Sequence, residues 1–180
     1  MNLPKLSDQQ SANSKQRGKA GFTLIELLLV IAIISILISI GLASFSRAQK
    51  QTRDRQRQSD LKNIAGALEQ FYSDFNTYPD SNSGKIEVYT GVANCTDTTG
   101  TADTLDWGSE GIKCGSPEKN YMSQLPADPL SSASYTYKVN GTKQIYCLIV
   151  ATFEITPDAA DQIECPVDST NYDYVVTSQN

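Results

Sequence analysis

Histidine is absent from the 180 residues of this chain. Because histidine most often serves as the general acid or base near neutral pH, its absence removes the usual catalytic arrangements. A zinc site is also disfavoured, since the four cysteines form no C-x-x-C pair and no imidazole can complete a ligand set. The sequence therefore predicts a protein that is not an enzyme and needs neither a cofactor nor a metal.

Charge is missing from residues 27–45, a stretch of 19 residues, and Glu26 is the only charged residue in the 24-residue apolar run 22–45. At about 1.5 Å per residue, a helix of this length is roughly 28–36 Å long and can cross a bilayer core of about 30 Å. A carboxylate near one end of such a helix costs free energy and is not needed for spanning. Glu26 therefore calls for an explanation.

Proline is absent between Pro4 and Pro79, and Gly41 is the only strong helix-weakening residue in the apolar run. One helix from Phe22 to Phe75, about 80 Å long, is expected. Its last part carries apolar residues at the spacing of one buried stripe. These are Leu61, Ile64, Ala65, Leu68, Phe71, Tyr72 and Phe75.

The part after Pro79 alternates in the manner of β-strands, so we expect an α+β fold in which the long helix packs on a small antiparallel sheet. Strands are predicted at 133–139, 144–155 and 173–177, and Asn140-Gly141 predicts a two-residue hairpin. The face expected against the helix holds Ile145, Cys147, Ile149, Ala151 and Phe153. Residues 91–119 are expected to form surface loops anchored by Trp107.

Cysteine is absent before Cys95, and all four cysteines fall in this second half. Outside the cell they are expected to be oxidised, with three possible connectivities. We favour Cys95–Cys114 and Cys147–Cys165, because each bond closes a local loop worth roughly 3 kcal/mol.

The segment Lys19-Ala20-Gly21-Phe22-Thr23-Leu24-Ile25-Glu26-Leu27 resembles the leader junction of type IV pilins and pseudopilins. The resemblance implies a cut by a membrane prepilin peptidase after Gly21 and N-methylation of the new terminal residue, Phe22. It also places the family's assembly glutamate at Glu26. A weaker resemblance to pseudopilins covers Leu68 to Pro79 and Tyr121 to Tyr137.

Two roles are open for Glu26. Cleavage would create an amine four residues before it, on the same helix face, so Glu26 could neutralise the amine of its own chain. It could also neutralise the Phe22 amine of an adjacent subunit, which would set the register of a helical polymer. The family resemblance favours the second role, and the two do not exclude each other.

The resemblance and these patterns together imply four regions: a cleaved leader 1–21, a transmembrane and polymerisation helix 22–45, an amphipathic stem 46–78 and a β-rich head 79–180. Three basic residues close to the apolar run, Lys15, Arg17 and Lys19, predict a cytoplasmic N-terminus and an external head.

Two other kinds of N-terminal segment are also compatible with part of this pattern. Gly41-Leu42-Ala43 could end a secretory signal peptide, but the apolar run is longer than usual and contains Glu26. An uncleaved single-pass anchor carrying a surface binding domain is the remaining alternative.

Residues 47–62 hold six basic and two acidic side chains, while residues 63–180 have a net charge of −11. We expect the basic stem to face the acidic heads of neighbouring subunits, with a solvated helix face as the alternative. Nucleic acid binding is possible but not indicated, because the stretch lacks interleaved aromatic residues. Some pseudopilins bind calcium near the C-terminal end, but Asp158, Asp161 and Glu164 match no dedicated calcium motif and are read as surface acids.

The expected function is that of a structural subunit of a type IV pilus-like filament. The alternative is a pseudopilin of a type II secretion or DNA-uptake machine. Expected partners are further copies of the chain, the prepilin peptidase and methylase, an assembly platform, and the lipid bilayer before assembly.

Overall fold

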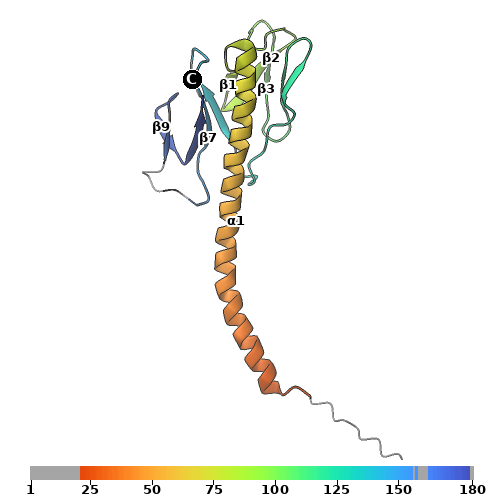
Figure 1. Ribbon diagram of the computed structural model, residues 1–180, viewed down its shortest axis with the longest axis vertical. Coiled ribbons are helices and arrows are strands. Elements are labelled where there is room, and N and C mark those ends of the chain that lie inside the picture. Colours follow the sequence, from red (N-terminus) through yellow and green to blue (C-terminus); the bar gives the residue numbers. More distant parts are fainter. Residues whose placement is uncertain (1–20, 156, 158–161, 179–180) are drawn as a thin grey trace, which may run out of the picture. The chain divides into compact units, whose positions relative to one another are not determined.

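A computed structural model describes residues 21–155, 157 and 162–178 (Figure 1). The chain divides into two compact units, Met1–Leu42 and Ala43–Asn180, and each is described by itself. The expected leader residues Lys15, Arg17 and Lys19 lie outside the described part.

Helix α1 spans Leu24–Phe75, 52 residues, and continues through Gly41. Its most apolar window has a mean hydropathy of 2.8, so by length and composition it can cross a membrane. The hydroxyls of Ser35 and Ser39 donate to the carbonyl oxygens of Ile31 and Ser35, at 2.7 and 2.8 Å. These two serines are thus satisfied within their own helix.

The end of α1 is set by its last turn and by the proline that follows. Asn76 has a φ of 55°, and its amide donates to the carbonyl of Tyr72 at 2.7 Å, a common way for a helix to end. Pro79 three residues later cannot continue a helix. The predicted stop is confirmed.

Within the described residues, every strand is paired antiparallel, in two three-stranded sheets and two ribbons. One sheet has the order β1-β2-β3, the other β10-β7-β6, and the ribbons are β4-β5 and β8-β9. The strands are β1 Asp80–Asn82, β2 Lys85–Thr90, β3 Thr101–Thr104, β4 Ile112–Cys114, β5 Lys119–Met122, β6 Thr136–Val139, β7 Tyr146–Val150, β8 Ile163–Cys165, β9 Thr170–Tyr172 and β10 Tyr174–Thr177. The α+β prediction is confirmed.

The main core joins the second half of α1 to both sheets. Leu61, Ile64, Leu68 and Phe71 are fully buried, so the stripe predicted from their spacing is confirmed. Ala65, Tyr72 and Phe75 are partly buried beside them. These side chains pack against residues of several strands, among them Ile86, Val88, Ile112, Tyr121, Tyr137, Tyr146 and Leu148.

Strand β7 corrects one prediction. Its face towards the α1 stripe holds Tyr146, Leu148 and Val150, whereas Cys147 and Ile149 belong to a second cluster with Cys165 and Val175. The face that packs against the helix is therefore opposite to the face that was predicted from the sequence. All five residues of β7 are buried, because the strand is central and covered on both faces. An apolar run with no polar alternation does not indicate which face meets the helix.

The connection between β6 and β7 corrects a second prediction, that of a two-residue hairpin. It is a hairpin, but the loop runs from Asn140 to Ile145 rather than through two residues. The Asn140 side chain accepts hydrogen bonds from the amides of Gln144 and Ile145, at 2.9 and 3.1 Å. Lys143 supplies the positive φ of 56° at the turn. The asparagine thus organises a longer loop instead of the tight turn that Asn-Gly predicts.

Two disulfides join the pairs favoured from the sequence, Cys95–Cys114 and Cys147–Cys165, each with a Cα–Cα distance of 5.9 Å. The first lies within residues 91–119, which contain β3 and β4 as well as loops. The second ties the β8-β9 ribbon to β7. Trp107 is half-buried and packs edge-on against Tyr135, with ring centroids 5.9 Å apart.

Candidate functional site

The first turn of α1 is closed by Thr23 and Glu26. The Glu26 carboxylate oxygen Oε2 accepts hydrogen bonds from the amide and the hydroxyl of Thr23, at 2.8 and 2.9 Å. The Glu26 amide donates to the Thr23 hydroxyl at 3.3 Å. This reciprocal arrangement is a capping box, which satisfies donors that the first turn of a helix otherwise leaves free.

The structure thus shows a second role for Glu26 besides the expected amine partner. Within the described residues, the hydrogen bonds that the Glu26 carboxylate accepts all go to Oε2, which leaves Oε1 available. Gly21 and Phe22 lie just before the helix, and the Phe22 side chain is 89% exposed. Thr23 is a functional residue that the expectations from the sequence lack, although its T-x-x-E spacing before an apolar run is the pattern of a capping box.

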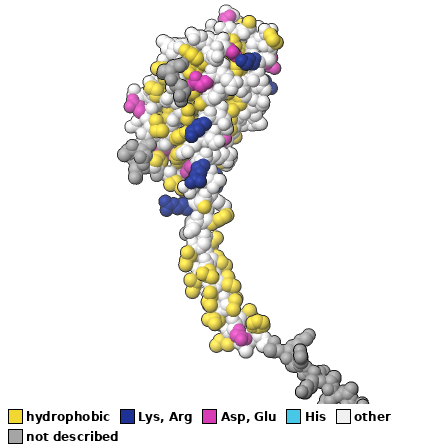
Figure 2. All heavy atoms as spheres, in the orientation of Figure 1, with side chains coloured by type: hydrophobic (Ala, Val, Ile, Leu, Met, Phe, Trp, Pro, Cys, Tyr) yellow, Lys and Arg dark blue, Asp and Glu magenta, His cyan; other side chains and the backbone are white. Residues whose placement is uncertain are grey.

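The apolar side chains of α1 between Leu24 and Leu42 are exposed throughout this unit of the chain. Figure 2 shows hydrophobic side chains gathered along this stretch of the helix. Nothing in the described part of the chain covers them, and exposed apolar surface of this extent marks a membrane or protein contact.

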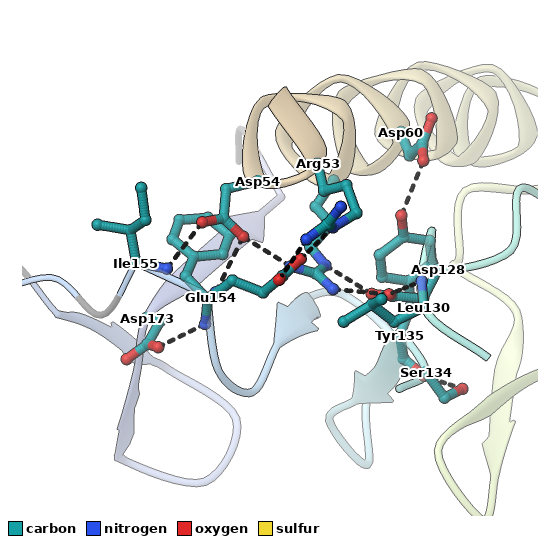
Figure 3. Close-up of polar contacts among 12 residues, drawn as sticks. Arg53, Asp54, Asp60, Asp128, Leu130, Ser134, Tyr135, Glu154, Ile155 and Asp173 are labelled. Atoms are coloured by element: carbon teal, nitrogen blue, oxygen red, sulfur yellow. Dashed lines mark hydrogen bonds and ion pairs between the residues drawn. The ribbon is translucent and has the colours of Figure 1, made fainter. Parts of the chain in front are cut away.

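Two arginines of the second half of α1 form ion pairs with the head, and Figure 3 labels one of them, Arg53, together with the acidic partners. The Arg57 guanidinium donates two parallel hydrogen bonds to Asp128, both at 2.8 Å, and one to Asp54 at 2.6 Å. Arg53 donates two hydrogen bonds to Glu154, that from Nη2 at 2.6 Å. Bidentate pairs of this kind fix geometry as well as charge. Hydrogen bonding to Asp128 raises the pKa of Arg57, so this 1% exposed group stays charged.

Two buried carboxylates capture the backbone of the loop that follows β7. Asp54 accepts hydrogen bonds from the amides of Glu154 and Ile155, at 3.1 and 3.0 Å. Asp173 accepts one from the Phe153 amide at 2.7 Å. Three consecutive amides are thereby satisfied by side chains, which holds an irregular segment against the helix.

Carboxylates further along α1 are bonded to tyrosines of the head. Tyr135 donates to Asp60 at 2.7 Å and Tyr121 to Asp74 at 2.6 Å. Burial raises the pKa of Tyr135, and the hydrogen bond to Asp60 raises it further. Burial also raises the pKa of Asp60 itself. This polar row lies beside the apolar stripe and fixes how the helix sits on the strands.

The expected role of the basic stem needs a correction. Arg53 and Arg57 are used inside the chain, bonded to acidic residues of the same head. The exposed cations that remain on this stretch are Arg47, Lys50, Arg55 and Lys62. Only these four are placed to face another molecule.

Of the three acidic residues near the C-terminal end that could have formed a calcium loop, only Glu164 is described. Asp158 and Asp161 lie outside the described residues, and Glu164 is exposed. Among the residues that the structure describes, no group of three or more potential metal-ligating side chains comes together.

The N-terminal segment of the chain matches a known family. Residues 16–42 match the family described as "Prokaryotic N-terminal methylation motif". The match covers the leader junction, the capping box and the exposed apolar part of α1.

Curated relatives extend the similarity into the head. The chain is 30% identical to type II secretion system core protein G of Pseudomonas aeruginosa over 129 residues, 72% of this chain and 80% of the relative. It is also 30% identical to core protein G of Escherichia coli over 119 residues, 66% of this chain and 69% of the relative. Type IV major pilin protein PilA of Myxococcus xanthus is 38% identical over 60 residues, 33% of this chain and 27% of the relative. No solved structure matches the chain.

Proposed function

The chain belongs to the family of type IV pilins and type II secretion pseudopilins, and from this premise we propose that it is a structural subunit of a type IV pilus-like filament. Members of this family are structural subunits rather than enzymes, and the family implies assembly into pilus or secretion filaments after processing by prepilin peptidase. The membrane-anchored precursor becomes a filament subunit.

Processing is proposed to occur at the Gly21–Phe22 bond, with methylation of the Phe22 amine. In support, both residues lie in an exposed segment before the helix, where a peptidase can reach the backbone. The proposed regions of the chain are then the leader 1–21, the polymerisation helix 22–45, the stem 46–78 and the head 79–180. The N-terminus is proposed to be cytoplasmic and the head external, because of Lys15, Arg17 and Lys19.

One observation carries the proposed assembly mechanism: a carboxylate stands at the start of an exposed apolar helix with one oxygen held by Thr23 and the other available. In a bundle of such helices the environment is apolar, so the new Phe22 amine needs an opposite charge. Glu26 of an adjacent subunit supplies it and fixes the register between neighbours.

A pseudopilin of a type II secretion system is the second candidate function. The observation in its favour is coverage: the similarity to the Pseudomonas aeruginosa core protein G includes 80% of that protein, against 27% for the Myxococcus xanthus pilin. Abundant filaments of this chain in material sheared from cells would favour the pilus subunit, whereas short filaments confined to the envelope would favour the pseudopilin.

The test of the assembly mechanism compares Glu26→Ala, Glu26→Gln and an exposed control, Glu118→Ala. Membrane insertion of Glu26→Ala should be no worse, since a charge leaves the apolar run. Cleavage should persist, because the glutamate lies five residues beyond the bond. Assembly should fail, since the Phe22 amine then lacks its partner in a low-dielectric surrounding.

The measurement is the ratio of assembled filament to processed membrane pool for each variant. Glu26→Gln should also be defective because it keeps the shape but not the charge, while Glu118→Ala should assemble normally. Wild-type amounts of Glu26→Ala filament would show that Glu26 serves only its own helix.

A further inference from the structure

Strand β10 ends its sheet and lacks the charge, proline or bulge that commonly protect an edge, while strand β8 of the neighbouring ribbon packs beside it. β10 pairs with β7 on one side and ends the sheet on the other. Its four residues, Tyr-Val-Val-Thr, include no charge and no proline, and its register with β7 contains no bulge. Edge strands commonly carry such features to prevent pairing with another chain. The other edge of the sheet, β6, is bonded to the Gly84 carbonyl through the Tyr137 amide at 2.8 Å.

A groove of about 530 Å³ runs along the unpaired edge, between β10 and α1. All four residues of β10 line it, facing Lys62, Gly66 and Glu69 of the helix. The Glu69 carboxylate is already bonded to the hydroxyls of Tyr78 and Tyr146. Lys62 is exposed and makes no ion pair within the described residues. The groove thus offers an open strand edge and one free positive charge.

Gly66 is a second, independent indication that this groove receives another chain. Glycine destabilises the interior of a helix relative to alanine. Here a Cβ added at Gly66 would meet nothing within 4 Å, so no contact inside the chain requires glycine. A small residue that opens a groove beside an unpaired strand is explained if another backbone comes close at this point.

Within the described residues, the chain itself provides an edge strand that fits. β3 ends the other sheet, and Thr101, Ala102 and Asp103 are exposed. It has four residues, as β10 has, with small side chains and a single charge. That charge, on Asp103, is opposite in sign to that of Lys62 and makes no ion pair within the described residues.

We propose that β3 of a second copy of this chain adds to the edge of β10 and that its Asp103 pairs with Lys62 in the groove. Main-chain hydrogen bonds would supply the attachment, as in other cases of strand addition, and the charge pair would supply the register. The contact joins two different surfaces of the same molecule. Such a heterologous contact does not close a two-fold dimer; it propagates into a ring or into an open helical array, and the helical array is the form that a filament needs. The inference rests on the proposed function and assigns a head-to-head contact to the filament.

The first experiment reverses the two charges. Lys62→Asp and Asp103→Lys should each reduce the ratio of assembled filament to processed membrane pool, because each places like charges together. The double variant should recover filament towards the wild-type amount. The control is Asp97→Lys, on an exposed residue that lines neither this groove nor the surface around Asp103, and it should leave assembly unchanged. If every variant is folded and the double variant still forms no more filament than the single variants, the proposed pairing is wrong.

The second experiment detects the contact directly. A chain carrying Lys62→Cys and Asp103→Cys should form disulfide-linked ladders in sheared filaments, whereas Lys62→Cys with Asp97→Cys should not. Gly66→Leu should reduce filament formation, while Gly141→Leu, at another glycine with open space around it, should not. Filaments that form without ladders would overturn the inference and leave the proposed function standing. Cross-links from position 62 to a different protein would also overturn it. A wild-type chain that forms no filament would instead contradict the proposed function.

Discussion

At the scale of single residues, Arg57 is the most deeply buried of the charged residues that the structure describes. It is 1% exposed, and its partners Asp54 and Asp128 are also buried. From the sequence, Arg57 was one of six basic side chains on the stem. Its partner Asp128 lies 71 residues away, so only the packing of helix on head could single it out.

Replacing Arg57 with methionine should destabilise the protein by about 3–5 kcal/mol, because two buried carboxylates lose their charged partner. Arg57→Lys should recover only part of the loss, since lysine cannot form the parallel pair of bonds to Asp128. The check is chemical unfolding of detergent-solubilised full-length protein. Arg55→Ala, on an exposed residue of the same helix, should change stability by less than about 0.5 kcal/mol. Equal stability of the Arg57→Met and Arg55→Ala proteins would contradict this role.

Asp168, in the turn of the β8-β9 ribbon, should make the stability of the fold depend on pH. The Lys138 ammonium, helped by the Tyr172 hydroxyl, lowers the pKa of Asp168 from its ordinary value of 3.8 to about 2. Because the pKa is lower in the folded state, this carboxylate adds stability above about pH 4, and the addition is lost as the pH falls from about 4 to about 2. Asp168→Asn should remove that part of the pH dependence and be less stable at neutral pH.

The readout is the unfolding midpoint of both proteins between pH 2 and pH 7. Taking the difference between the two curves removes the contribution of the other carboxylates. A difference that stays constant through the acid range would show that the Lys138–Asp168 pair does not stabilise the fold.

At the scale of elements, the helix was the most predictable part. Its length follows from the absence of proline, and its buried face follows from the spacing of Leu61 and the apolar residues after it. The orientation of β7 was not predictable, because a strand covered on both faces carries no alternation. The T-x-x-E spacing of Thr23 and Glu26 is sufficient to predict a capping box. From the sequence, Glu26 was interpreted only as the partner of an amine. The arginine pairs depend on contacts across 71 and 101 residues, which no local pattern reports.

The two disulfides should be separable in their effects. Removing Cys147 and Cys165 together frees the β8-β9 ribbon from β7, while removing Cys95 and Cys114 frees a loop on the other sheet. Each loss should cost about 3 kcal/mol by loop closure. Hydrogen exchange in β8 and β9 should rise only in the first variant.

Peptide mapping of unreduced protein taken from the cell surface checks the connectivity first. It should yield Cys95 linked to Cys114 and Cys147 linked to Cys165. Cross-paired peptides would overturn this pattern, and free thiols would show that the head is not in an oxidising compartment.

At the scale of the whole molecule, the chain combines two parts with opposite solvent preferences. Residues Leu24 to Leu42 expose apolar side chains throughout, whereas the unit Ala43–Asn180 has its own buried core. The first part therefore needs an apolar surrounding, such as lipid or other copies of the helix, whereas the second buries its own apolar side chains. This division suits a subunit that is stored in a membrane and then assembled into a filament.

The most direct test of this account is the intact mass of the protein recovered from sheared filaments. The recovered chain should start at Phe22 and carry one methyl group on its amine, with both disulfides formed. Gly21→Val should block the cut and leave the precursor in the membrane. A recovered chain that begins at Met1, or at Ser44 after a signal-peptide cut, would contradict the account.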